Sequence, residues 1–542
     1  MLAVALAAVM LVAAGCQAVA GLDLNGVLKN ALKVQSMEGK QSVEFQLKLK
    51  PEALAAAEPE EAAIASLLSK VKLELTDIKM KDANTGSFDG ALTLGDMRLG
   101  FNLRTAGNLT VLKLDGLAKP IELDLTAESL SGLLGGTGMP GLGGGMMGTG
   151  LPAAASPDMQ AEFKQLADSL IDIVGGYAID NLPNPTRLTV EPATAQVGGE
   201  SLPLMKVHAD INGEELWKWA GDYLDALIAD REGLEEALTG VMKLLAENQE
   251  LWESLGEGNP FAGMPEGAEL EEEIGSGVEA ILDALTEVQK EYRSVNPEDI
   301  EPVFNENAYI KADIYADAKL HIRKQSIELG FKTEAPSDAA AEPGMNPMAM
   351  AASVMDGFVI RMDSESWNIN GDVTPDAPVK TKGAITPERL EGMQGYQFLR
   401  ELDAESALYD LMRNKLHIGK QEITMYPSYD DYPPIVTPDG RTLVPLRSVV
   451  SQLGASVSAN PDGTIRVYDD GARTGIDLQL GSRDAVVNGK PVKWSYPVTL
   501  LASGVTYVPA RDLAAALECK ISWQAMYEGS PEQVFVISRE VD

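Results

Sequence analysis

The last quarter of the chain contains an internal repeat, and this repeat restricts the fold more than any other feature. The segment Thr442–Arg447 matches Thr506–Arg511 at an offset of 64 residues. Each copy follows a Gly turn, at Gly440 and Gly504, and precedes a short apolar helix and a strand. Pro suits the start of such a helix because its missing N–H is not needed there. One small unit buries little surface alone, so we expect both copies to pack into one α+β domain over residues 416–542.

The repeat resembles the copper amine oxidase N-terminal-like domain, which is common at the ends of secreted and surface proteins of Gram-positive bacteria. The positions that carry the resemblance are two Gly-Lys turns, a proline pair, the stretch Asp439–Thr442 and the Val-Pro-x-Arg motif of each copy: Gly419, Lys420, Gly489, Lys490, Pro433, Pro434, Pro445, Arg447, Pro509 and Arg511. The resemblance implies an accessory module without catalytic activity, which binds cell-wall polymer or a protein partner.

Two roles are open for Arg447 and Arg511. A guanidinium group can bind carboxylates or phosphates of wall polymers. It can also act structurally, by bonding carbonyls at the helix start or pairing with nearby acids. Because the arginine recurs in each unit, we favour the structural role for the repeated motif.

The N-terminus has the pattern of a targeting segment. Leu2–Val12 is almost wholly apolar, which matches a signal-peptide core and is too short to span a bilayer. It runs into Ala13-Ala14-Gly15-Cys16, which resembles a bacterial lipobox. The resemblance implies removal of residues 1–15 and acylation of Cys16, which would anchor the protein in the cell membrane on its extracytoplasmic face. A cleaved signal without lipid is the alternative. No positive charge precedes the apolar core, so a start upstream of Met1 is also expected.

Residues 16–415 read as a second α+β region, in which long amphipathic strands alternate with helices. We expect strands near 43–49, 71–80, 88–94, 97–103, 110–114, 121–125, 187–191, 204–211, 310–322, 326–332, 358–362 and 367–369, and helices near 27–34, 157–174, 216–229, 234–246, 277–292 and 396–413. The alternation shifts phase near Thr76-Asp77, which predicts a β-bulge. Low-complexity insertions lie near 131–157, 254–276 and 335–354.

The layout of this region resembles the LolA/LppX-like lipoprotein carriers. That resemblance implies a strongly curved antiparallel sheet that wraps helices around an apolar cavity. The predicted fold class is therefore α+β, with a curved antiparallel sheet and packed helices, followed by the small two-repeat domain.

Composition excludes several functions. Asp and Glu number 81 against 44 Lys and Arg, for a formal net charge of −37, which opposes binding to nucleic acid. Three His and two Cys make a metal centre improbable on counting alone, and no catalytic motif occurs in its proper context, so we expect no cofactor, metal or enzymatic site. Cys519 lies among apolar residues and is predicted to be buried and inert.

These observations lead to one main hypothesis and two alternatives. The main hypothesis is a lipid-anchored, non-enzymatic surface protein whose C-terminal module binds cell wall or a protein partner. The first alternative is a carrier, in which the 24–415 region holds a lipid or another amphiphile in an apolar cavity. The second is a hydrolase with an unrecognised pair of acids.

Overall fold

The computed structural model describes residues 21–82, 84–124, 157–248, 268–296, 300–301, 303–333, 353–527 and 529–541. The chain forms two compact units. The first holds the chain before Asp115 together with Ile121–Ala384, and the second holds Asp115–Pro120 together with the chain from Ile385. The predicted domains met at residue 416. The division lies earlier because the segment after Ala384 is bonded to the short insertion: the Ile385 amide donates to the Pro120 carbonyl, and Leu117 bridges Leu402.

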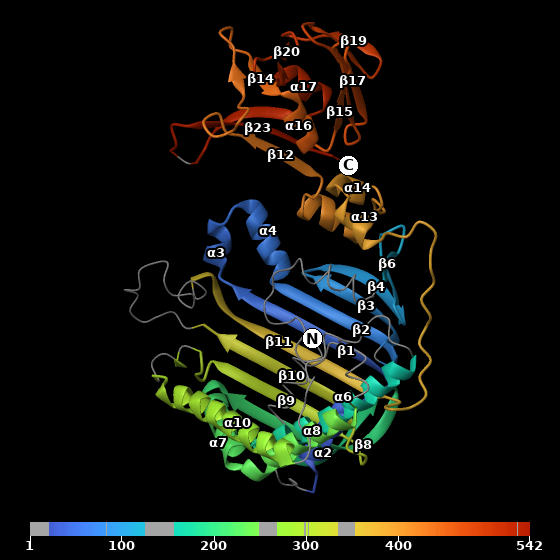
Figure 1. Ribbon diagram of the computed structural model, residues 1–542, viewed down its shortest axis with the longest axis vertical. Helices are drawn as coiled ribbons and strands as arrows, with labels where there is room; N and C mark the ends of the chain where they lie inside the picture. The colour runs from blue at the N-terminus through green and yellow to red at the C-terminus, as the bar shows by residue number, and fades with distance from the viewer. Residues whose placement is uncertain are drawn as a thin grey trace. The chain divides into compact units, whose positions relative to one another are not determined.

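The first unit is built on one curved antiparallel sheet of eleven strands, which confirms the predicted fold class (Figure 1). The strands run in the order β6-β5-β4-β3-β2-β1-β11-β10-β9-β8-β7. Their bounds are Met37–Leu49 (β1), Lys70–Asp82 (β2), Thr85–Leu94 (β3), Met97–Ala106 (β4), Leu109–Leu114 (β5), Ile121–Asp124 (β6), Leu188–Val197 (β7), Glu200–Asn212 (β8), Ala308–Ala316 (β9), Ile322–Lys332 (β10) and Met355–Trp367 (β11). Strand β1 therefore pairs with β11, although more than 300 residues separate them in the sequence.

Helices pack on one face of this sheet, which we call the inner face. The helices of the unit are Leu24–Leu32 (α2), Pro51–Ala56 (α3), Pro59–Leu68 (α4), Pro157–Asp180 (α6), Gly213–Ala229 (α7), Arg231–Glu247 (α8) and Ala268–Ser294 (α10). Helices α2, α6 and α7 bury their apolar side chains against β8–β11, around Val207, Ile314 and Ile327. Helices α8 and α10 pack on α6 and α7, whereas α3 and α4 lie by the ends of β1 and β2 (Figure 1). None of the described helices is long and apolar enough to cross a membrane.

The predicted bulge is confirmed, and one predicted strand is wrong. The pairing of β2 with β3 shifts register between Thr76 and Lys79, where Asp77 has a φ of 48°. The alternating stretch 310–322 was expected to be one strand, but the chain turns back at Asp317. The Asp317 amide donates to the His321 carbonyl, and its carboxylate accepts from the Lys319 and His321 amides, which closes a hairpin between β9 and β10.

Helices α3 and α4 were not predicted, although Pro51 and Pro59 each stand in the first turn of an Ala- and Glu-rich run. The predicted helix near 396–413 is divided into Gly395–Leu399 (α14), Ala407–Asp410 (α15) and the π-helix Leu411–Lys415 (η2), after a short helix Pro387–Glu391 (α13). The low-complexity insertions fall mostly outside the described residues, at 131–156, 254–267 and 335–352.

After α13–α15 and η2, the described residues of the C-terminal unit from Lys420 onward form three small sheets and two short helices. The strands are Lys420–Met425 (β12), Ile435–Val436 (β13), Thr442–Pro445 (β14), Ser456–Ala459 (β15), Thr464–Asp469 (β16), Thr474–Gln479 (β17), Asp484–Val487 (β18), Lys490–Lys493 (β19), Thr499–Leu500 (β20), Thr506–Pro509 (β21), Lys520–Ala525 (β22) and Gln533–Glu540 (β23). Helices Leu446–Gln452 (α16) and Ala510–Ala516 (α17) follow β14 and β21.

The two copies of the repeat pair with each other, as the sequence predicts. Strand β14 runs antiparallel to β21, with Val444 opposite Val508. Both side chains are fully buried in one apolar core, to which α16 contributes Val450 and α17 contributes Leu513. Each copy thus supplies the apolar surface that the other lacks.

Candidate functional site

The inner face of the sheet carries four successive rows of side chains on β1, β11 and β10. The strand register aligns Leu47 with Phe358 and Phe331, and then Phe45 with Ile360 and Leu329. The next two rows are Val43, Met362 and Ile327, followed by Gln41, Ser364 and Gln325. Three rows are therefore apolar and the fourth is polar without charge. A cavity lies at each end of this pattern.

The first cavity, which we call the apolar cavity, lies at the end where β11 begins. It has a volume of about 480 Å³. Its lining residues come from β8 to β11, from the start of α7 and from the segment before β9: Ile211, Asn212, Gly213, Leu216, Val303, Phe304, Ala308, Tyr309, Ile310, Leu329, Gly330, Phe331, Met355, Phe358 and Ile360. Every side chain in this set is apolar except those of Asn212 and Tyr309. Such a lining can bind hydrocarbon and offers few groups for chemistry.

The two polar residues of the apolar cavity have partners elsewhere. The Asn212 side chain accepts from the Glu215 amide and caps helix α7. The Tyr309 hydroxyl lies 2.8 Å from Glu328, and burial raises the pKa of Tyr309 to about 12. Its ring lies against Gly330, where a Cβ atom would meet it at 2.3 Å. Gly330 is thus required for the ring position.

An aromatic cluster stands next to the apolar cavity. The Trp217 ring lies 5.0 Å from that of Phe304, which lines the cavity, and stacks on Tyr292 at 4.4 Å. Trp219, two residues on, is buried and donates its indole N–H to the Pro183 carbonyl. The two tryptophans therefore lie in different environments, and Trp219 belongs to the core.

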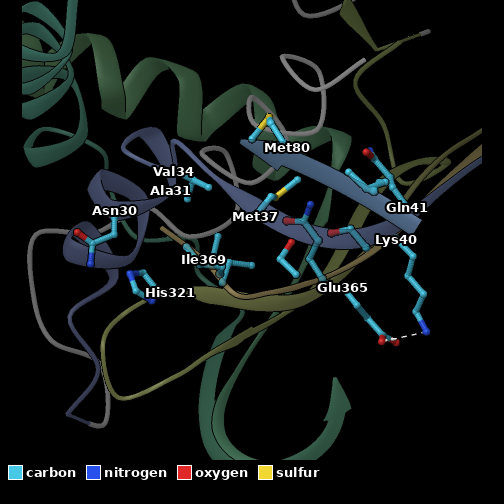
Figure 2. A pocket seen from close by; sticks show the side chains of 15 residues that line it. Asn30, Ala31, Val34, Met37, Lys40, Gln41, Met80, His321, Glu365 and Ile369 are labelled. Atoms are coloured by element: carbon cyan, nitrogen blue, oxygen red, sulfur yellow. Dashed lines mark ion pairs between the residues drawn. The ribbon is translucent and has the colours of Figure 1, made fainter. Parts of the chain in front are cut away.

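The second cavity, which we call the polar cavity, lies at the opposite end of the rows and has a volume of about 150 Å³ (Figure 2). The fourth row, Gln41, Ser364 and Gln325, lines it. Other lining residues are Asn30, Ala31, Val34, Met37, Lys40, Ile78, Met80, His321, Ile322, Glu365, Ser366 and Ile369. Figure 2 labels Asn30 and His321 among the lining residues and marks the ion pair of Lys40 and Glu365, whose Nζ and Oε2 atoms are 3.0 Å apart.

Alternation along residues 310–322 would put His321 on the polar face of a strand. His321 lies in the hairpin turn instead, with only 20% of its side chain exposed and Nδ1 at 3.8 Å from Asp317. His208 does lie on the outer face of the sheet, with Nδ1 2.7 Å from Asp313. His417 is 3.0 Å from Glu540 in the C-terminal unit. Within the described ranges, no three His, Cys, Asp or Glu side chains are grouped as a metal site.

The repeated motif of the C-terminal unit has well-defined backbone roles. Pro445 and Pro509 are the residues before the first turns of α16 and α17, with φ of −67° and −65°. Gly440 and Gly504 have φ of 77° and 78°, which side chains disfavour. These four residues of the motif therefore set the turns and helix starts.

Arg447 and Arg511 do not make the structural contacts that we expected, either with carbonyls at the helix start or with nearby acids. Both side chains are exposed, and neither makes a hydrogen bond or an ion pair with any of the described residues. The reason is that both point outward from the first turn of a helix whose inner side is already filled by apolar side chains.

The internal arginine of the unit is Arg539, which the sequence analysis missed. Its side chain is 1% exposed and pairs with Asp469, which is 0% exposed. Arg539 also donates to the carbonyls of Leu453 and Leu517, at 3.2 and 3.0 Å. These are equivalent residues of the two copies, at the ends of α16 and α17. Arg539, on β23, thus caps the C-terminal ends of both helices.

Two predicted cysteine roles have different outcomes. Cys519 is half-buried, and burial raises its pKa to about 11, which agrees with an inert thiol. Cys16, with the signal-peptide and lipobox patterns, lies outside the described residues.

Comparison with known proteins identifies the C-terminal region. Residues 420–528 match the family model of the copper amine oxidase N-terminal domain, which confirms the resemblance found in the repeat. That domain is non-catalytic. No curated protein and no solved structure matches the chain. The likeness of the larger unit to the LolA/LppX-like carriers stays a prediction.

Proposed function

We propose that the protein is a lipid-anchored, extracytoplasmic binding protein whose larger unit holds the apolar chain of an amphiphile on the inner face of its sheet. The apolar cavity is the observation that carries this proposal. It combines a volume of about 480 Å³ with a lining in which only Asn212 and Tyr309 are polar, and both already have partners. Protein interiors are close-packed, so an ordinary apolar core would not contain an empty space of about 480 Å³.

The proposal places the anchor at Cys16 and the protein on the outer side of a Gram-positive cell membrane. The apolar stretch Leu2–Val12 and the residues before Cys16 support this location. An acidic body with a net charge of −37 is repelled by an anionic bilayer surface, so the anchor rather than charge attraction would hold it there. The protein acts by binding and has no catalytic role.

Native mass spectrometry tests the carrier function. The chain is secreted by its host with a cleavable signal in place of residues 1–16, so that it carries no covalent lipid, and is purified without detergent. We expect an additional mass at one copy per chain, which organic solvent removes. The variant A308F places a phenyl ring in the apolar cavity, and it should lose this mass. The matched control A56F adds the same ring to the exposed end of α3 and should retain it. An unliganded wild-type mass, together with no uptake of added lipid, would contradict the proposal.

A second function belongs to the C-terminal module, which we propose binds an anionic wall polymer or a surface protein. The supporting observation is the exposure of Arg447 and Arg511 at equivalent positions of the repeat, without partners among the described residues. An unpaired guanidinium is available for carboxylates and phosphates. The double variant R447Q/R511Q should lower co-sedimentation with purified cell wall, whereas the control R473Q, at another exposed arginine, should not. Equal binding by all three proteins would exclude this role.

A further inference from the structure

The polar row on the inner face is half-buried and makes no side-chain hydrogen bonds within the described protein. Gln41, Ser364 and Gln325 stand side by side on three neighbouring strands, and each is half-buried. None of their side chains makes a hydrogen bond to another of the described residues. Their polar atoms are not fully buried, so water can reach them when no ligand is bound. A ligand that covers them must replace those hydrogen bonds, because a covered polar group without a partner costs free energy. The row lines the polar cavity, so a ligand there can supply the missing bonds.

We propose that the polar cavity binds the uncharged, hydroxyl-bearing head group of the amphiphile whose chain lies in the apolar cavity. This inference rests on the proposed carrier function. It adds the class of ligand, which is a lipid with a glycerol- or sugar-like head rather than a free fatty acid or a phospholipid.

The side chains around the polar cavity explain why the head group is uncharged. The two charged residues of the lining, Lys40 and Glu365, form an ion pair at 3.0 Å, and Lys324 lies 3.5 Å from the same carboxylate. His321 faces the Asp317 carboxylate at 3.8 Å. An anionic head would therefore meet no unpaired cation in this lining, and a cationic head would meet no unpaired carboxylate. Burying an unpaired charge there is costly.

The hydrogen-bonding groups fit hydroxyls. Each glutamine amide offers two N–H donors and a carbonyl acceptor, and the serine hydroxyl both donates and accepts. A hydroxyl of the ligand also does both, so it can satisfy either end of an amide. A carboxylate only accepts, and would leave the carbonyl oxygens of Gln41 and Gln325 without donors.

The arrangement of the rows explains why one ligand can reach both cavities. Ile360 lines the apolar cavity and Ser364 lines the polar one, on the same strand and the same face. Four residues of strand span roughly 13 Å. Between the cavities, β1 presents Phe45 and Val43, which are both half-buried and apolar. A hydrocarbon chain can thus lie along β1 from one cavity to the other.

Isothermal titration of the full chain with three twelve-carbon ligands tests the head-group preference. The probes are 1-monolauroylglycerol, lauryl acetate, which has no donor, and laurate at a pH where its carboxylate is ionised. We expect monolauroylglycerol to bind at least about tenfold more tightly than the other two, which corresponds to one or two net hydrogen bonds. If laurate or lauryl acetate binds equally well or better, the head-group site is refuted while the carrier function stands. If none of the three ligands binds, the carrier function itself fails.

Variants then assign the preference to the polar row. Q41L/Q325L should weaken monolauroylglycerol binding about tenfold and leave lauryl acetate within twofold. The matched control Q46L changes a glutamine of the same strand on the outer face, opposite Val359, and should leave both affinities unchanged. A preference that persists in Q41L/Q325L would overturn the assignment. Since the ranking in the wild-type protein is measured independently, a variant that fails to fold does not remove the test.

Discussion

Removal of the buried arginine of the C-terminal unit should destabilise that unit far more than removal of an exposed one. The variant R539M keeps most of the side-chain volume and deletes the guanidinium. It leaves the Asp469 carboxylate fully buried without its cation. It also removes one donor from each helix end: the Leu453 carbonyl keeps only the Gln421 amide, and the Leu517 carbonyl keeps only the weak Cys519 thiol. The Arg539 Nε–H bond to Gln421, at 2.7 Å, is lost as well.

The magnitude follows from burial. Breaking a buried ion pair from one side costs about 3–5 kcal/mol, because the remaining charge is uncompensated. The matched control is R466M, in the same unit. Its partner Asp477 lies at 2.7 Å, but the two side chains are 71% and 50% exposed, so this pair should contribute less than about 1 kcal/mol.

Hydrogen exchange measured by mass spectrometry on the full chain separates the two variants. In R539M, peptides from β12, β22 and β23 should lose about 3–5 kcal/mol of protection, because Arg539 lies on the strand between the other two. In R466M they should change little. Adding D469L to R539M should recover at least about 2 kcal/mol of the summed losses, since an apolar pair needs no charge partner. Equal effects of R539M and R466M would refute the reasoning.

Three further predictions concern single residues. G440A should cost about 1 kcal/mol in urea unfolding because φ is 77° there, whereas G475A, at a glycine without positive φ, should be less costly. Cys519 should react with iodoacetamide at neutral pH far more slowly in the folded protein than in urea, because its pKa is raised to about 11. Lys119, 2.9 Å away, lowers the pKa of Glu401, so this carboxylate should stabilise the C-terminal unit above pH 4.5 and lose that contribution as the pH falls further. In the variant E401Q, the free energy of unfolding should lose the part of its decrease below pH 4.5 that Glu401 causes.

The sequence alone predicts features that depend on neighbours along the chain. The bulge at Thr76-Asp77 is visible as a phase shift in the alternation, and the pairing of the two repeat copies follows from their similarity and small size. The hairpin at Asp317 was missed because apolar residues continue to alternate through the turn. The signal that could have revealed it is Asp317 itself, whose carboxylate accepts two backbone amides of the turn.

Features that depend on distant pairing could not be predicted. Arg539 and Asp469 are 70 residues apart, and nothing near either one indicates an ion pair. Conversely, the recurrence of Arg447 and Arg511 suggested a structural role, yet the groups that end the repeated helices are bonded by an arginine outside the repeat. Repetition therefore identified the backbone positions of the motif but not the contacts of its side chains.

The polar row illustrates how local and distant information combine at a binding site. The alternation in β1 places Gln41 on the same face as Val43 and Phe45, and this is readable from the sequence. The strand register that sets Gln41 beside Ser364 joins segments more than 300 residues apart. The sequence does not reveal this register, so the row of three polar side chains cannot be predicted from Gln41 alone. Leucine at Gln41 and Gln325 should raise stability, because an unpaired half-buried amide is replaced by an apolar group of similar size. A polar row that lowers stability at the end of an apolar face is what a ligand site requires, since the bonds that the fold leaves unmade are the ones that a ligand can form.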